Sequence, residues 1–147
     1  MRVLLQRVKK ASVWINGQNT GSIGHGVLLF TGVGIHDTEA QAEYLADKCA
    51  HLRIFSDEQG KMNRSLVDTG GSALVVSQFT LYGDCSHGRR PSFIYAAPPG
   101  RGDALYRHFV AHLKKCIPDV QTGVFGAMMD IELINDGPVT LMLEREP

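Results

Sequence analysis

Runs of apolar and β-branched residues along the chain predict a series of strands. Residues 3–8 and 11–15 have this character, and Asn16-Gly17 after them is a strong hairpin signal because both residues tolerate a positive φ. The other predicted strands are residues 26–33, 73–81, 120–125, 129–134 and 139–144. The run at 73–81 is the most apolar, so we expect it to lie in the centre of a sheet.

Two stretches, residues 39–52 and 103–116, place apolar residues at helical spacing. Asp37-Thr38 precedes the first and predicts its N-terminal cap. The apolar positions are Leu45, Cys49 and Leu52 in the first and Leu105, Phe109 and Leu113 in the second. Many strands and two helices in irregular order predict an α+β fold with a largely antiparallel sheet, built as one domain over residues 1–147.

Composition narrows the possible partners. No apolar run approaches the roughly 18 residues that a membrane span needs, and the N-terminus lacks the apolar core of a signal peptide, so we expect no membrane contact. Fifteen basic residues balance fifteen acidic ones. This balance argues against an extended nucleic-acid footprint and leaves room for a partner contacted at one end only. A local basic cluster does occur, at His87, Arg89, Arg90, Arg101 and Arg107.

The cysteine and histidine patterns predict neither a disulfide framework nor a metal site. The three cysteines are widely spaced and no CxxC occurs, which favours a reducing, cytoplasmic environment. Cys49 and Cys116 are expected on buried helix faces. His108 and His112 have a spacing that can hold a metal, but no third ligand is evident, so surface histidines are expected. No cofactor motif is present.

Polar side chains gather at the end of the most apolar strand, in the segment Ser77-Gln78-Phe79-Thr80. Ser77 or Thr80 is a possible nucleophile, but no base with an orienting carboxylate accompanies them. Alternatively, the N–H groups of Gln78, Phe79 and Thr80 point into a pocket and stabilise an oxyanion, while the side chains position a substrate. A third interpretation is an edge strand whose polar residues face water. The pattern alone leaves these alternatives open.

Gly137-Pro138 is the second unusual segment. Proline fixes φ and removes a donor, and glycine lets the backbone approach another surface closely. We therefore expect a turn at a hairpin tip that presents its carbonyl oxygens rigidly.

The two segments together resemble the signature motifs of the D-aminoacyl-tRNA deacylases. The motifs are Ser77-Gln78-Phe79-Thr80-Leu81 and Asn135-Asp136-Gly137-Pro138-Val139-Thr140. Further segments resemble the same family, and the resemblance covers nearly the full length; these are Gln6-Arg7-Val8, Gly60-Lys61-Met62-Asn63, Gly88-Arg89-Arg90-Pro91-Ser92-Phe93, Ala96-Ala97-Pro98 and Thr122-Gly123-Val124-Phe125-Gly126-Ala127. Two positions depart from the pattern, Met128 where an aspartate is frequent and His87 where a lysine is common.

The resemblance implies a homodimeric cytosolic hydrolase with a barrel-like sheet and no cofactor or metal. Its substrate is the ester between a D-amino acid, or mischarged glycine, and the 3′-terminal adenosine of tRNA. Each active site combines Ser77, Gln78, Phe79 and Thr80 of one subunit with the Gly137-Pro138 tip, in a cis peptide, and Val139 of the other. The tip rejects L-aminoacyl groups by steric clash.

The resemblance also implies a mechanism in which the RNA takes part. The 2′-hydroxyl of the terminal ribose helps to activate the attack, and Phe79 N–H stabilises the oxyanion. Thr80 either binds the substrate or has a structural role. Met129 and Ala97 are expected to line the adenosine pocket. Two other functions remain as alternatives, a small-ester hydrolase with Thr80 or Ser77 as nucleophile and a non-catalytic binder of RNA ends.

Overall fold

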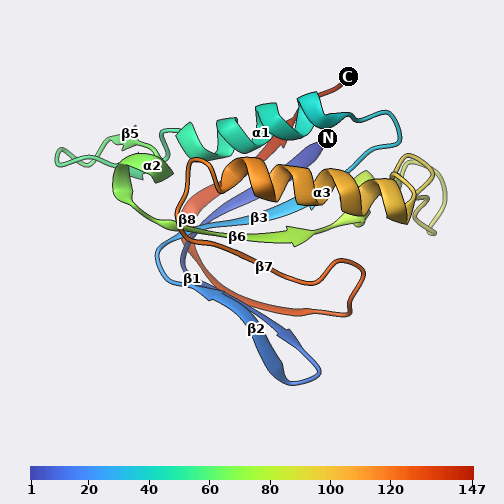
Figure 1. Cartoon of the computed structure of the whole chain (residues 1–147), viewed down its shortest axis with the longest axis horizontal. Helices are drawn as coiled ribbons and strands as arrows, with labels where there is room; N and C mark the ends of the chain where they lie inside the picture. The colour runs from blue at the N-terminus through green and yellow to red at the C-terminus, as the bar shows by residue number, and fades with distance from the viewer.

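The computed structural model describes residues 1–147, and two long helices cover one face of a curved sheet (Figure 1). The strands are β1 (Arg2–Ile15), β2 (Gln18–Ile23), β3 (Gly26–Gly32), β4 (Phe55–Ser56), β5 (Met62–Arg64), β6 (Ser72–Ser77), β7 (Val120–Thr122) and β8 (Asp130–Glu144). The helices are α1 (Glu39–His51), the short α2 (Leu66–Thr69), the 3₁₀-helix η1 (Phe79–Tyr82) and α3 (Pro99–Leu113). The two chain termini lie close together, near one end of α1.

The main sheet has the order β2-β1-β3-β6-β7, with β8 on the other side of β1. β1 is antiparallel to β2, β3 and β8, as expected for a largely antiparallel sheet. The pairs β3–β6 and β6–β7 are parallel, so the sheet is mixed. Parallel neighbours need a crossover connection, and α1 and α3 lie within the two crossovers. This places both helices over the same part of the sheet.

Several strand boundaries differ from the sequence prediction. Residues 3–8 and 11–15 form the single strand β1, which pairs with β3 through its first half and with β2 through its second half. Residues 129–134 and 139–144 likewise join in β8. Gly137-Pro138 therefore lies inside a strand and not at a hairpin tip. The β1–β8 register shifts around Gln6 and Val8, and such an irregularity accommodates a proline that has no N–H to donate.

The helix α1 begins at Glu39 as predicted, whereas α3 differs from prediction at both ends. It stops at Leu113, so Cys116 lies just beyond the helix and not on its face. α3 begins at Pro99, four residues earlier than the predicted Asp103, because proline is well tolerated in the first turn of a helix. Thr38 caps α1 in a capping box with Gln41, as its sequence position predicted. The predicted Asn16-Gly17 hairpin turn is confirmed, with φ of 50° and 76°.

Two apolar clusters pack on the two faces of β3 and β6. The larger cluster lies between the sheet and the helices and includes Leu5, Leu29 and Phe109. The smaller lies on the other face, where Leu28, Leu74 and the second half of β1 meet. Alternate residues of β3 therefore enter different clusters, as the period of a strand requires. No helix is long and apolar enough to cross a bilayer.

Candidate active site

The chain changes conformation immediately after β6, and this change positions the first motif. Gln78 N–H donates to the Thr31 carbonyl at 2.8 Å, which ties the end of β6 to β3. Phe79 then begins η1, so the last third of the predicted strand 73–81 is a 3₁₀-helix instead. The first N–H groups of such a helix have no acceptor within it. The N–H groups of Phe79 and Thr80 are in this position, whereas Leu81 N–H already donates to the Gln78 carbonyl.

A cavity of about 730 Å³ opens beside η1. It brings together the predicted site residues Ser77, Gln78, Phe79, Thr80, Ala97 and Met129. The rest of its wall is mainly apolar and comes from Val33, Val76, Phe93, Ala96, Pro99, Gly102, Phe125, Gly126, Ala127, Met128 and Ile131. The cavity therefore combines a polar edge at the motif with a broad apolar surface suited to an aromatic ring.

No histidine, cysteine, carboxylate, lysine or arginine lines this cavity. Thr80 Oγ1 instead accepts a hydrogen bond of 2.5 Å from Gln78 Nε2. His87, the nearest histidine in sequence, contacts Ser86 Oγ at 2.7 Å through its Nδ1 and is exposed. The protein thus supplies neither Ser77 nor Thr80 with a base of its own inside the cavity, which disfavours a protein nucleophile.

Aromatic and thioether side chains shape the walls of the cavity. Phe79 is 56% exposed and packs edge-on against Phe93, with ring centroids 5.2 Å apart. Met129 lies directly against Gly123, because a Cβ at that glycine would be only 2.6 Å from the Met129 sulfur. A larger residue at 123 would therefore push Met129 out of its place in the wall.

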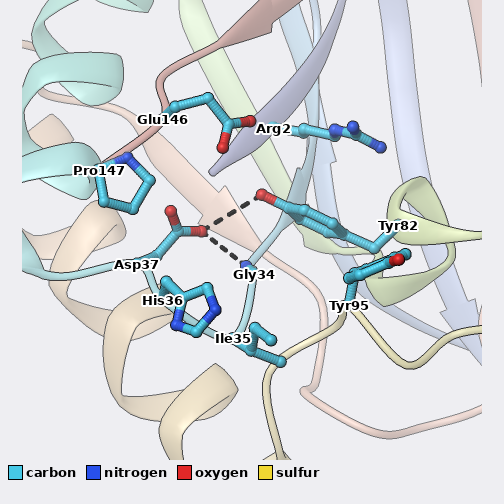
Figure 2. Close-up of a pocket in the computed structure, with 9 residues that line it drawn as sticks. All are labelled: Arg2, Gly34, Ile35, His36, Asp37, Tyr82, Tyr95, Glu146 and Pro147. Carbon is cyan, nitrogen blue, oxygen red and sulfur yellow. Dashed lines mark hydrogen bonds between the residues drawn. The ribbon is translucent and has the colours of Figure 1, made fainter.

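A second cluster surrounds Tyr82, the last residue of η1 (Figure 2). The Asp37 carboxylate accepts hydrogen bonds from Gly34 N–H at 2.6 Å and from the Tyr82 hydroxyl at 3.3 Å. Tyr82 packs so closely on Gly34 that a Cβ there would lie 2.8 Å from the hydroxyl oxygen. Burial, reinforced by the Asp37 charge, raises the pKa of Tyr82 well above its ordinary value. The phenol is therefore a stable neutral donor.

Two charged groups complete this cluster. The Met1 α-amine forms a fully buried ion pair with Asp37 at 2.6 Å. Arg2 lies over the Tyr82 ring, 4.6 Å from its centroid, and donates to the Leu81 carbonyl at 2.8 Å. Sequence reasoning missed this cluster, because its members are far apart along the chain and belong to no motif.

The Gly137-Pro138 segment lies outside the cavity of its own chain. Both residues are exposed, and their peptide bond is cis. The Arg7 side chain holds the segment, donating to the Asp136 and Gly137 carbonyls at 3.2 and 3.5 Å. Val139, by contrast, is buried in the larger core cluster, and its carbonyl accepts from Asn135 Nδ2 at 3.2 Å. The buried Val139 side chain therefore fixes the end of the segment to the core.

The cysteines and histidines lie away from the cavity. Cys49 is buried as predicted, and burial raises its thiol pKa from 9.0 to about 12. Cys116 is half-buried and packs against the core cluster. The His108 side chain is only partly exposed, at 31%, and its Nε2 contacts Glu43 Oε1 at 2.8 Å. This contact lowers the pKa of the Glu43 carboxyl, so the pair joins α3 to α1.

The fold is α+β, and its cavity joins the Ser77–Thr80 motif to an apolar wall; known proteins that match this chain over nearly its full length are aminoacyl-tRNA deacylases, a class of hydrolases. The profile of the family described as D-Tyr-tRNA(Tyr) deacylase matches residues 4–144. The chain is 62% identical to the D-aminoacyl-tRNA deacylase of Thermomicrobium roseum over 144 residues, covering 98% of this chain and 94% of that protein. It is 56% identical to the deacylase of Halalkalibacterium halodurans over 146 residues, covering 99% and 100%. The chain belongs to the D-Tyr-tRNA(Tyr) deacylase family.

Solved structures show the same architecture. The c-Myc DNA unwinding element binding protein superimposes with a TM-score of 0.94 at 36% identity, over 100% of both chains. A probable eukaryotic D-amino acid tRNA deacylase superimposes with a TM-score of 0.84 at 20% identity over 97% of each chain, which shows the shared fold. The family and the α+β fold expected from the sequence are thus confirmed.

Proposed function

We propose that this protein hydrolyses the ester that joins a D-amino acid, or mischarged glycine, to the 3′-terminal adenosine of tRNA. The observation that carries the proposal is the cavity that gathers Ser77 to Thr80 without a catalytic base. A serine or threonine nucleophile needs such a base to activate it. An enzyme that only positions the ester, while a hydroxyl of the bound tRNA takes part in the cleavage, does not need one.

The reaction proposed for the cavity is direct hydrolysis by water, without a covalent intermediate on the protein. Water adds to the ester carbonyl carbon, and Phe79 N–H, unpaired within its helix, stabilises the oxyanion. The 2′-hydroxyl of the terminal ribose helps to activate this water: it takes up one proton of the water and passes its own proton to the 3′-oxygen. The bond from the carbonyl carbon to the 3′-oxygen breaks, and the free amino acid and the tRNA 3′-hydroxyl are released. Thr80 stays uncharged and bound to Gln78 Nε2, so its role is to fix Gln78 and bind substrate.

The apolar wall is proposed to hold the adenine. Ala97 and Met129 lie among the lining residues, and Met129 is fixed in place by its contact with Gly123. An apolar wall binds a base by van der Waals contact without contacting the rest of the RNA.

Selection against L-amino acids is proposed to come from a second copy of the chain. β8 is 15 residues long, pairs only with β1, and exposes Ile134, Leu141 and Met142. A long apolar edge strand of this kind is suited to association with another subunit. In a homodimer, the exposed Gly137-Pro138 segment of the partner would enter the cavity, and its carbonyl oxygens would clash with an L side chain.

The proposed compartment is the cytoplasm, where aminoacyl-tRNA is used. All three cysteines are free thiols, which fits a reducing environment.

One set of assays tests the proposed function. The purified protein, with metal chelated, is given D-tyrosyl-tRNA, L-tyrosyl-tRNA and glycyl-tRNA. We expect cleavage of the first and third and survival of the second. D-tyrosyl-tRNA that ends in 2′-deoxyadenosine should be nearly inert, while Thr80→Ala should keep substantial activity on the normal substrate.

Other outcomes identify the alternatives. Full activity on the 2′-deoxy substrate, with a trapped acyl group on Thr80 or Ser77, would indicate a protein-nucleophile hydrolase. Binding of tRNA without cleavage at any enzyme concentration would indicate a binder of RNA ends.

A further inference from the structure

Residues 84–92 form a closed loop that immediately precedes the cavity-lining residue Phe93. Asp84 and Ser92 pair across its base, with N–H to carbonyl distances of 2.7 and 2.9 Å. The Asp84 carboxylate also accepts from Ser86 N–H at 2.9 Å, and its hydrogen bonds to Ser86 hold the pKa of Asp84 below the ordinary value. Gly88, with φ of +66°, makes the turn. The loop is thus an ordered projection.

This loop carries the only members of the predicted basic cluster that have no partner in the protein. Arg101 donates to the Asp37 carbonyl at 2.5 Å, and Arg107 pairs with Asp103 at 2.9 Å. Arg89 and Arg90 are exposed, and no carboxylate lies within ion-pair distance of either. Two adjacent guanidinium groups without a counter-charge repel each other and attract an anion.

The loop is joined to the cavity through Phe93. This residue follows Ser92, lines the cavity and packs against Phe79. Arg90 precedes Phe93 by three residues, so the chain between them spans at most about 10 Å. The loop that carries the two arginines therefore lies close to the cavity, at the end of the molecule opposite β5 (Figure 1).

The position and charge of the loop identify its ligand. With the terminal adenosine in the cavity, the phosphates of the preceding nucleotides must leave through the mouth. Guanidinium groups bind phosphate oxygens in bidentate fashion, more strongly than neutral donors do. We propose that Arg89 and Arg90 bind the backbone phosphates of the single-stranded 3′ end of tRNA. This inference rests on the proposed function and adds where the RNA runs outside the pocket.

A comparison of two substrates tests the loop separately from the pocket. D-tyrosyl-tRNA has the phosphates, and 3′-O-D-tyrosyl-adenosine has the same ester without them. For the double variant Arg89→Gln/Arg90→Gln we expect KM for the tRNA to rise about tenfold, with kcat within twofold of wild type. Cleavage of the nucleoside ester should not change. The slope of log(kcat/KM) against log[salt] should become shallower by roughly 0.7 for each lost contact.

Matched variants control for charge and for folding. Arg64→Gln removes the same charge from β5, at the far end of the molecule where Arg64 pairs with Glu58, and should leave both substrates unaffected. The single variants Arg90→Gln and Arg90→Lys are compared as well. Arg90→Lys keeps a cation, so its KM for the tRNA should rise less than that of Arg90→Gln. Thermal unfolding of each variant checks that the fold is intact.

The outcomes separate the two proposals. Loss of activity on both substrates by the folded double variant would mean that the loop shapes the pocket, and unchanged KM for the tRNA would mean that it binds no phosphate; either result overturns the inference. A wild-type protein that cleaves neither ester would overturn the proposed function instead.

Discussion

The Arg2 guanidinium donates a hydrogen bond of 2.8 Å to the carbonyl of Leu81 and so links the first strand to the 3₁₀-helix of the candidate site. The same group covers the Tyr82 ring at 4.6 Å, and Tyr82 in turn contacts Asp37 (Figure 2). A short 3₁₀-helix has few hydrogen bonds of its own, so external contacts of this kind must hold it in place. Arg2 therefore holds Leu81 and Tyr82, the second half of η1, and we expect it to position Phe79 and Thr80 at the start of this helix.

Arg2→Met should lower kcat for D-tyrosyl-tRNA by roughly tenfold while KM changes little, because the donors of η1 lose their fixed position. The free energy of unfolding should fall by about 1 kcal/mol with the lost hydrogen bond. Steady-state kinetics and urea unfolding measure the two effects. Glu144→Gln is the matched control, since it removes the ion pair with Arg2 but leaves the bond to Leu81. If both variants behave alike, Arg2 does not position η1.

Gly34→Ala should destabilise the protein by about 1–3 kcal/mol, because the new methyl group would lie within 2.8–3.0 Å of the Tyr82 ring and hydroxyl. Gly24→Ala makes the same chemical change where nothing lies within 4 Å, and its effect should stay within about 0.5 kcal/mol. Urea unfolding compares the two. Tyr82→Phe added to Gly34→Ala should restore part of the loss, since it removes the nearest atom. Equal stability of the two alanine variants would contradict this account.

The sequence could group Ser77 to Thr80 because these residues are contiguous. Ala97 and Met129 are distant from them in the chain and were expected there from the family resemblance. The structure places all six on the wall of one cavity. The conformation of the segment was not predictable in the same way. Residues 73–81 form one apolar run, and periodicity alone does not show that the backbone turns at Gln78. That turn depends on contacts with β3, such as the bond from Gln78 N–H to the Thr31 carbonyl.

The strand order was less predictable for a related reason. Parallel pairing of β3 with β6 depends on packing across crossovers that contain the helices, and no local signal specifies it. Gly137-Pro138 has the composition of a turn, yet pairing with β1 continues on both sides of it. The cluster of Arg2, Asp37 and Tyr82 likewise joins residues that no spacing rule connects.

The free energy of unfolding should fall at alkaline pH, because a buried thiol and two buried phenols stay neutral in the native state. Burial raises the pKa of Cys49 from 9.0 to about 12 and the pKa of Tyr82 and Tyr106 above their ordinary value of 10.0. Above these ordinary values the unfolded chain loses protons that the native chain keeps, so each group lowers the free energy of unfolding. The loss begins near pH 9 with the thiol and increases from pH 10, by at most about 1.4 kcal/mol per pH unit per group.

Urea unfolding at pH 7, 9, 10 and 11 measures this dependence. Cys49→Ala should remove the part of the decline that begins near pH 9 and leave the part above pH 10, where the tyrosines ionise. Stability that stays constant up to pH 11 would contradict the assignment.

Gly137→Ala separates the proposed role of this residue in a partner's cavity from any role within its own chain. Within one chain, a Cβ at this position meets only Asn135 Oδ1, at an ordinary 3.6 Å, so the melting temperature should stay within about 2 °C of wild type. In the proposed homodimer the methyl group would enter the cavity beside the aminoacyl group. There it should lower kcat/KM for D-tyrosyl-tRNA at least tenfold or allow cleavage of L-tyrosyl-tRNA. Sedimentation at assay concentrations checks that the variant keeps the oligomeric state of wild type. Unchanged turnover and unchanged rejection of the L ester, in a variant with normal stability and assembly, would show that Gly137-Pro138 does not gate the pocket.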